Sequence, residues 1–88
     1  MEYTTERFVI WDKPNDCARM DYKDALIVFT RKGDARARIR RDVMQHNRDF
    51  RYSQEGYVRP DYVAPYREVT EEDFEIVPCT VTFTINRT

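Results

Sequence analysis

Arginine is the residue whose type and spacing offer the clearest chemistry in this chain. Between residues 31 and 51 the chain has seven arginines and only one lysine, Lys32. A guanidinium is a planar set of donors that binds carboxylates and phosphates through directed hydrogen bonds. Asp34, Arg38 and Asp42 follow i, i+4 spacing, so Arg38 is expected to be neutralised within its own helix. Four further arginines are expected to be unpaired around Met44, as a partner-binding surface: Arg36, Arg40, Arg41 and Arg48.

The alternative for these arginines is an ordinary solvated surface. An acidic segment at 68–75 could fold back on them and neutralise part of their charge. The whole chain has a net charge of −1 and a pI of about 5.8. A charge near zero argues against a simple electrostatic binder of nucleic acid or membranes.

The second candidate for partner binding is a tyrosine- and proline-containing loop at about 51–69. Pro60 and Pro65 exclude a helix there and favour an extended path. Tyrosine is enriched in interface hot spots, and aromatic residues beside basic ones also bind single-stranded nucleic acid. The residues expected to contact a partner are Tyr57, Tyr62 and Tyr66. The alternative is that these tyrosines pack over one face of the sheet.

Residue types that support catalysis or metal binding are sparse. The one histidine, His46, and the two cysteines, Cys17 and Cys79, form no pair at a metal-ligand spacing. We expect His46 to be partly buried and hydrogen-bonded to a carboxylate or a carbonyl. The sequence contains neither a glycine-rich phosphate loop nor a nucleophile elbow. It therefore predicts a non-enzymatic protein with no catalytic residues, no metal and no cofactor.

Two strands are predicted at the ends of the chain. Residues 3–11 are rich in β-branched and aromatic types, and residues 12–16 form a turn. From Val77 onward, apolar residues alternate with threonines, which predicts a strand with an apolar core face made of Cys79, Val81, Phe83 and Ile85. The residues before Pro78 have the opposite parity, so Pro78 is expected at a bulge or at the strand's start.

The middle of the chain contains the predicted helix. The helix spans 34–47, with Asp34 as its cap and Ala35, Ile39, Val43 and His46 on one apolar arc. Before it, residues 25–31 predict a buried strand, while 17–23 fit a strand or a helix equally well. After the loop, residues 70–73 have the pattern of a capping box for one helical turn.

A chain of 88 residues fits one domain and buries about 60–65% of the surface that its unfolded form exposes. The elements predict an α+β fold, a small antiparallel sheet of three or four strands with one main helix packed on one face. Residues 1–88 are expected to form a single compact domain. In its core, Ile39 and Val43 are expected to meet Val28, Val81, Phe83 or Ile85.

These features predict a small protein-binding module, a regulator or inhibitor whose partner is a protein with an acidic surface. Its composition is similar to that of accessory proteins encoded by viruses or mobile elements. Nucleic-acid binding through the same helix is one alternative, and a homo-oligomeric structural subunit, assembled through the threonine-rich face or edge of the last strand, is another. Without a signal-like start or an apolar run of about 20 residues, we expect a cytoplasmic protein with reduced cysteines and no membrane contact.

Overall fold

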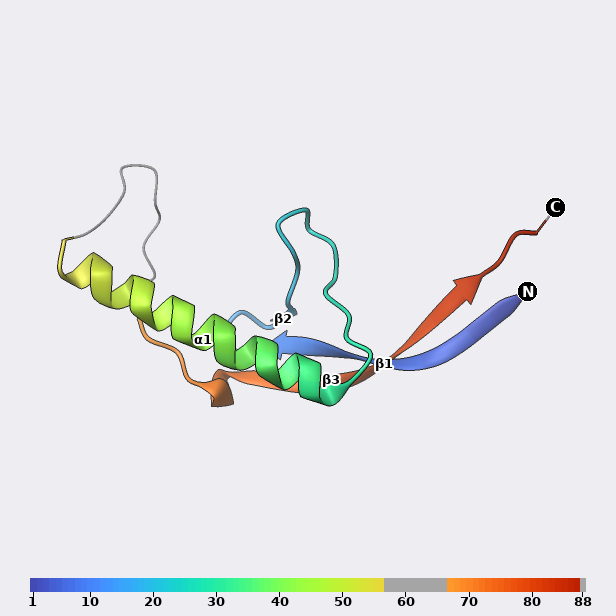
Figure 1. The fold of residues 1–88 in the computed structure, drawn as a ribbon, viewed down its shortest axis with the longest axis horizontal. Coiled ribbons are helices and arrows are strands. Elements are labelled where there is room, and N and C mark those ends of the chain that lie inside the picture. Colours follow the sequence, from blue (N-terminus) through green and yellow to red (C-terminus); the bar gives the residue numbers. More distant parts are fainter. Residues whose placement is uncertain (57–66, 88) are drawn as a thin grey trace.

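The computed structural model describes residues 1–56 and 67–87, so the predicted contact residues Tyr57, Tyr62 and Tyr66 lie outside the described residues. The elements are β1 (Glu2–Asp12), β2 (Cys17–Ala18), α1 (Lys32–Gln54), the 3₁₀ helix η1 (Glu71–Asp73) and β3 (Phe74–Thr84). The strands form a three-stranded antiparallel sheet in the order β2-β1-β3, with α1 lying alongside it (Figure 1). The predicted α+β fold class is confirmed.

The ladder between β1 and β3 is regular from one end to the other. It runs from Glu2 opposite Thr84 to Asp12 opposite Phe74 without a slip, so the bulge predicted at Pro78 is wrong. Pro78 lies opposite Phe8, and both backbone bonds of Phe8, at 2.9 and 2.8 Å, go to Phe29 on the other side of β1. Proline is tolerated here because its nitrogen faces the open edge of β3, where the ladder needs no donor.

The core lies between α1 and one end of the sheet. Ile10, which is 1% exposed, packs with Ala35 and Ile39 of α1. Phe29, Val43, Phe74 and Ile76 pack against this cluster. Ile76 lies directly opposite Ile10 in the ladder, so both belong to the face that α1 covers. The core positions predicted for Ile39 and Val43 are therefore confirmed.

The core partners predicted for the helix are wrong. Val28 is 42% exposed, Phe83 is 50% exposed and Ile85 is 48% exposed. The reason is that side chains alternate between the two faces of β3. Because β3 passes Pro78 without a bulge, the apolar side chains at Cys79 and beyond stay on the face opposite Phe74 and Ile76, and α1 packs on the face of those two residues.

The segment between β2 and α1 contains less sheet than predicted. Its ladder contacts are two isolated bridges, Phe8 with Phe29 and Met20 with Leu26, so a continuous strand at 25–31 is wrong. In 17–23, residues 17–18 are a short strand, Met20 forms a bridge and residues 22–23 form a turn, so this segment is not a helix. The Asp21 carboxylate accepts hydrogen bonds from the N–H groups of Lys23 and Ala25 at 2.8 and 3.0 Å. Such a side chain to backbone turn competes with ladder formation.

Helix α1 is longer than predicted at both ends. It begins at Lys32 with Arg31 as its N-cap residue, and Asp34 lies in the first turn, where it pairs with Arg31 at 3.2 Å and does not cap the helix. At the other end it continues into the segment predicted as a loop and stops at Gln54. Gly56, with φ of +88°, supplies the left-handed residue that ends many helices.

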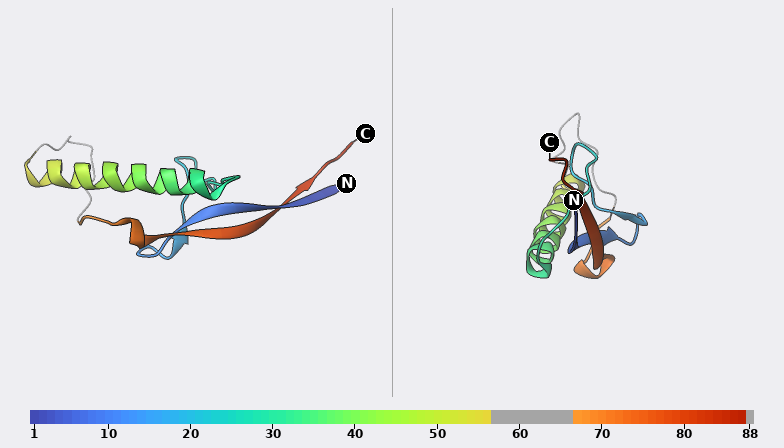
Figure 2. Two further views of the ribbon diagram at one scale, coloured as in Figure 1. Left: turned by 60° about the horizontal axis from the view of Figure 1, so that its bottom comes forward. Right: turned by 90° about the vertical axis from the view of Figure 1, so that its right-hand side faces the viewer.

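The molecule is elongated, with extents of 57 × 28 × 20 Å. Helix α1 lies beside one half of the long β1–β3 ribbon, and the other half runs past the start of the helix to the two chain ends (Figures 1 and 2).

Candidate interaction surface

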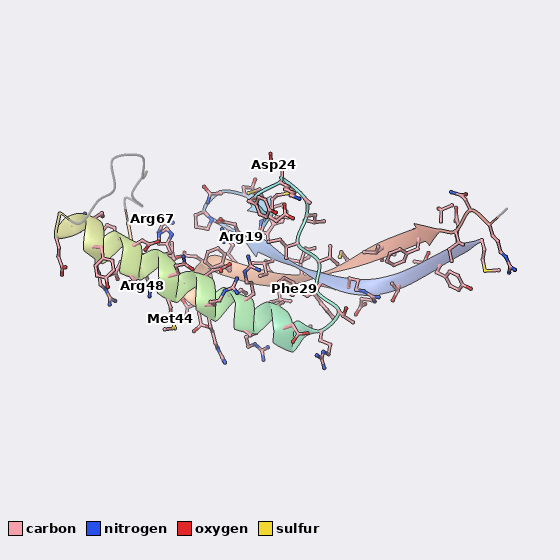
Figure 3. All side chains as sticks on the ribbon, turned by 45° about the horizontal axis from the view of Figure 1, so that its top comes forward. Arg19, Asp24, Phe29, Met44, Arg48 and Arg67 are labelled. Carbon is pink, nitrogen blue, oxygen red and sulfur yellow. The ribbon has the colours of Figure 1, made fainter. Side chains whose placement is uncertain are left out.

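The exposed side of α1 carries the arginines and the methionine predicted from the sequence. We call Arg36, Arg40, Arg41, Met44 and Arg48 the arginine–methionine surface. All five are exposed, and Met44 is 74% exposed. A groove of about 490 Å³ runs along this part of the helix, lined by Arg41, Met44 and Arg48 together with Val43, Gln45, Asn47 and Arg51. Figure 3 shows Met44 and Arg48 along α1.

The prediction that the four arginines are unpaired is wrong for two of them. Arg40 Nε lies 3.3 Å from Glu71 Oε1, and Arg41 Nε lies 3.7 Å from Asp42 Oδ1. Arg36 and Arg48 form no ion pair with any residue in 1–56 or 67–87. The Arg40–Glu71 pair is more than half exposed on both sides, so it adds little stability and leaves Arg40 available to a competing carboxylate.

Among the described residues, Asp42 is the acidic side chain that forms the most ion pairs. Arg38 Nε donates to both of its oxygens at 3.1 Å, and Arg19 Nη2 donates to Oδ2 at 3.1 Å. The predicted Arg38–Asp42 pair is confirmed. Arg19 also stacks over the Phe74 ring at 5.7 Å, so it joins the segment after β2 to both α1 and β3. Figure 3 shows Arg19 beside α1. Sequence spacing could not reveal Arg19, because it is 23 residues from Asp42.

His46 and Asn47 hold the segment that leads into η1. The Nε2 atom of His46 lies 2.8 Å from the carbonyl oxygen of Arg67, which confirms the predicted carbonyl bond. Asn47 both donates to the carbonyl of Val69 and accepts from its N–H, each at 2.8 Å. Sequence reasoning missed Asn47. A polar side chain four residues after Val43, on the apolar arc of the helix, is the signal that could have found it.

Replacing Asn47 with alanine is expected to release this segment. It removes both hydrogen bonds to Val69, so the Val69 amide should exchange with solvent roughly 10 to 100 times faster. Native-state hydrogen exchange measures this directly. Gln45→Ala, an exposed change on the same helix, is the control and should leave Val69 protected. Unchanged exchange at Val69 in Asn47→Ala would contradict the anchoring role.

The turn before η1 is fixed locally. The Asp73 carboxylate accepts a hydrogen bond from the Thr70 N–H at 2.9 Å, as the predicted capping box requires. This turn places Glu71 beside Arg40. An acidic side chain therefore lies next to a basic one at this edge of the arginine–methionine surface.

Within residues 1–56 and 67–87, no group of three histidine, cysteine or acidic side chains gathers in a way that could hold a metal ion. Both cysteines are free thiols. No helix among these described residues combines the length and the apolar character needed to cross a membrane. No protein-family model, no curated protein and no solved structure matches this chain.

Proposed function

We propose that the protein is a small non-catalytic protein-binding module that acts in a reducing, cytoplasmic environment. Its arginine–methionine surface would contact an acidic segment of a partner protein and so regulate or inhibit that partner. The observation that supports this is Met44, which is 74% exposed in a groove bordered by Arg41 and Arg48. An apolar centre with a charged rim is the arrangement of residues found at protein interfaces.

The proposal assigns the contacts to two groups of residues. The arginines of α1 would pair with carboxylates of the partner, while Met44 would pack against one of its apolar side chains. The loop tyrosines Tyr57, Tyr62 and Tyr66 would extend the contact as amphipathic anchors. We assign no catalytic step to the chain.

Nucleic acid is the alternative ligand for this surface, and the neighbouring acids count against it. A second groove of about 580 Å³ is lined by Arg36 and Arg40 but also by Glu71 and Glu75. Arg51, at the other end, pairs with Glu68 at 3.1 Å. A long polyanion would meet these carboxylates at both ends of the surface, whereas a short acidic peptide would avoid them.

Selection from a display library of short random peptides tests the proposal. We expect enriched peptides that combine acidic residues with a large apolar residue. Met44→Ser and Arg48→Gln should each weaken their binding by about 30-fold, the size of a hot-spot effect. Arg31→Gln is the matched control, because it removes one exposed arginine charge outside the groove and should leave affinity unchanged. Equal binding by wild type and both groove variants would contradict the proposal.

A random single-stranded oligonucleotide gives the opposite test. At physiological salt we expect no measurable binding. If the surface instead contacts about four phosphates, log affinity should fall by roughly 3–4 units per decade of salt. Arg36→Gln together with Arg40→Gln should then flatten that slope. Micromolar binding with this salt dependence, measured by fluorescence anisotropy, would favour nucleic acid over an acidic protein.

A further inference from the structure

The ribbon formed by β1 and β3 has a free half. Residues 1–6 pair with residues 80–85, and this half extends beyond α1 (Figures 1 and 2). β2 pairs with Trp11 and Asp12 at the other end of β1, and no third strand among the described residues borders the free half. A two-stranded ribbon alone is at best marginally stable in water, so this half needs a partner surface.

The two faces of the free half differ completely. Residues opposite each other in the ladder share a face, and successive residues alternate between faces. One face is polar and carries Glu2, Thr4, Glu6, Thr80, Thr82 and Thr84. The other face carries Thr5 and what we call the apolar stripe, namely Met1, Tyr3, Val81, Phe83 and Ile85.

The apolar stripe is exposed. Tyr3 is 53% exposed and Phe83 is 50% exposed, and Met1 and Ile85 at the end of the ribbon are 78% and 48% exposed. Since a large side chain presents roughly 150–250 Å², these four leave about 400 Å² of apolar surface in contact with water. The patch is confined to the free half, because Val9, further along the same face, is buried.

We propose that the apolar stripe docks face to face on the apolar stripe of a second copy of this chain. The stripe itself carries no charged side chain, so it fits an equally apolar surface, and Arg7, the next residue on this face, borders it by donating to Thr5 Oγ1 at 2.8 Å. The aromatic pair Tyr3–Phe83 lies at its centre, between Met1–Ile85 and Thr5–Val81. A two-fold axis that lies between the two aromatic pairs and runs perpendicular to the strands would set the Met1–Ile85 end of each stripe against the Thr5–Val81 end of the other copy.

The resulting two-layer sandwich turns both threonine- and glutamate-bearing faces outward to water, which closes the assembly at two copies. The two stripes together bury about 800 Å², below the 1,200–2,000 Å² of a standard stable interface. The dimer should therefore be weak, with a dissociation constant in the micromolar range.

This assembly goes beyond the proposed function and does not depend on it. By alternation, the apolar stripe belongs to the face opposite the one that α1 covers. A dimer would keep two arginine–methionine surfaces accessible and so bind a partner with repeated acidic segments through avidity.

Analytical ultracentrifugation across the micromolar range tests the dimer. Wild type is expected to shift from its monomer mass of 10.7 kDa to twice that value as concentration rises. Phe83→Lys should remain a monomer throughout. Thr82→Lys is the matched control, since it places the same charge on the next residue and the opposite face, and it should dimerise like wild type.

A second variant distinguishes loss of the dimer from loss of folding in Phe83→Lys. Ile85→Lys lies beyond the end of β3, so it should stay folded by circular dichroism while losing at least about tenfold in dimer affinity. The proposal is overturned if wild type stays monomeric at hundreds of micromolar, if a larger assembly forms, or if Thr82→Lys disrupts the dimer as much as Phe83→Lys does.

Discussion

Replacing Ile10 with alanine is expected to lower the free energy of unfolding by roughly 2–5 kcal/mol. Ile10 is 1% exposed and packs on Ala35 and Ile39, so the substitution leaves a cavity between β1 and α1. Ile39→Ala, at the other side of the same contact, should cost a similar amount. Domains of this kind are stable by only about 5–15 kcal/mol, so either variant should shift the urea midpoint well below that of wild type.

Phe83→Ala is the control for these core substitutions. It removes a larger side chain, but Phe83 is 50% exposed on the free half of the ribbon. In solutions dilute enough to dissociate the proposed dimer, we expect a loss of about 1 kcal/mol or less. A loss as large as that of Ile10→Ala would mean that the alternating apolar face of the last strand is the core after all.

Replacing Asp42 with asparagine is expected to cost about 1.5–3 kcal/mol, the range for hydrogen bonds to charged groups. The Asp42 side chain is 17% exposed and binds Arg19 and Arg38. Without its negative charge, two partly buried guanidiniums face each other with no counterion. The segment that contains Arg19 should loosen as well, and faster amide exchange at Ile27, whose N–H donates to the Arg19 carbonyl, would report it.

Glu68→Gln provides the comparison for Asp42→Asn, because it also removes one carboxylate charge from an arginine pair. Glu68 is 47% exposed and its partner Arg51 is 68% exposed. Exposed pairs of this kind contribute about 0–1 kcal/mol. Similar losses in the two variants, measured by urea unfolding, would contradict the central position that we assign to Asp42.

The long, strongly patterned elements could be predicted from the sequence. The helix, both long strands and the α+β class follow from apolar periods of 3.6 and 2. The ends of the helix could not be fixed in this way, because Arg31 is an unusual N-cap residue. Gly56 is the residue in the sequence that could have placed the end of the helix near Gln54.

The sequence alone could not predict which face of the last strand the helix covers. Alternation depends on neighbouring residues, whereas helix packing depends on residues far apart in the chain. The alternation from Cys79 to Ile85 correctly shows one apolar face. It does not show which face the helix covers, and that choice depends on Phe74 and Ile76 at the other end of the strand. The apolar alternation that the domain itself leaves exposed is the surface proposed for the dimer.

The candidate surface could be predicted in outline but not in its pairing. Residue spacing on one helix is enough to place Arg41, Met44 and Arg48 together. The Arg40–Glu71 and Arg51–Glu68 pairs depend on how the chain returns to the helix after residue 66, and no local pattern encodes that path.

The three methionines offer the most direct test of the proposed binding surface, because each reports on a different part of the molecule. Met44 lies in the groove of α1, Met20 follows β2, and Met1 lies at the end of the ribbon. All three are at least half exposed. The measurement is a methyl NMR spectrum of the labelled protein during titration with an acidic peptide from the library selection. We expect the Met44 methyl signal to shift to saturation while those of Met1 and Met20 stay in place. A Met44 signal that does not move at saturating peptide, or a shift at Met1 or Met20 in its place, would contradict the proposed binding surface.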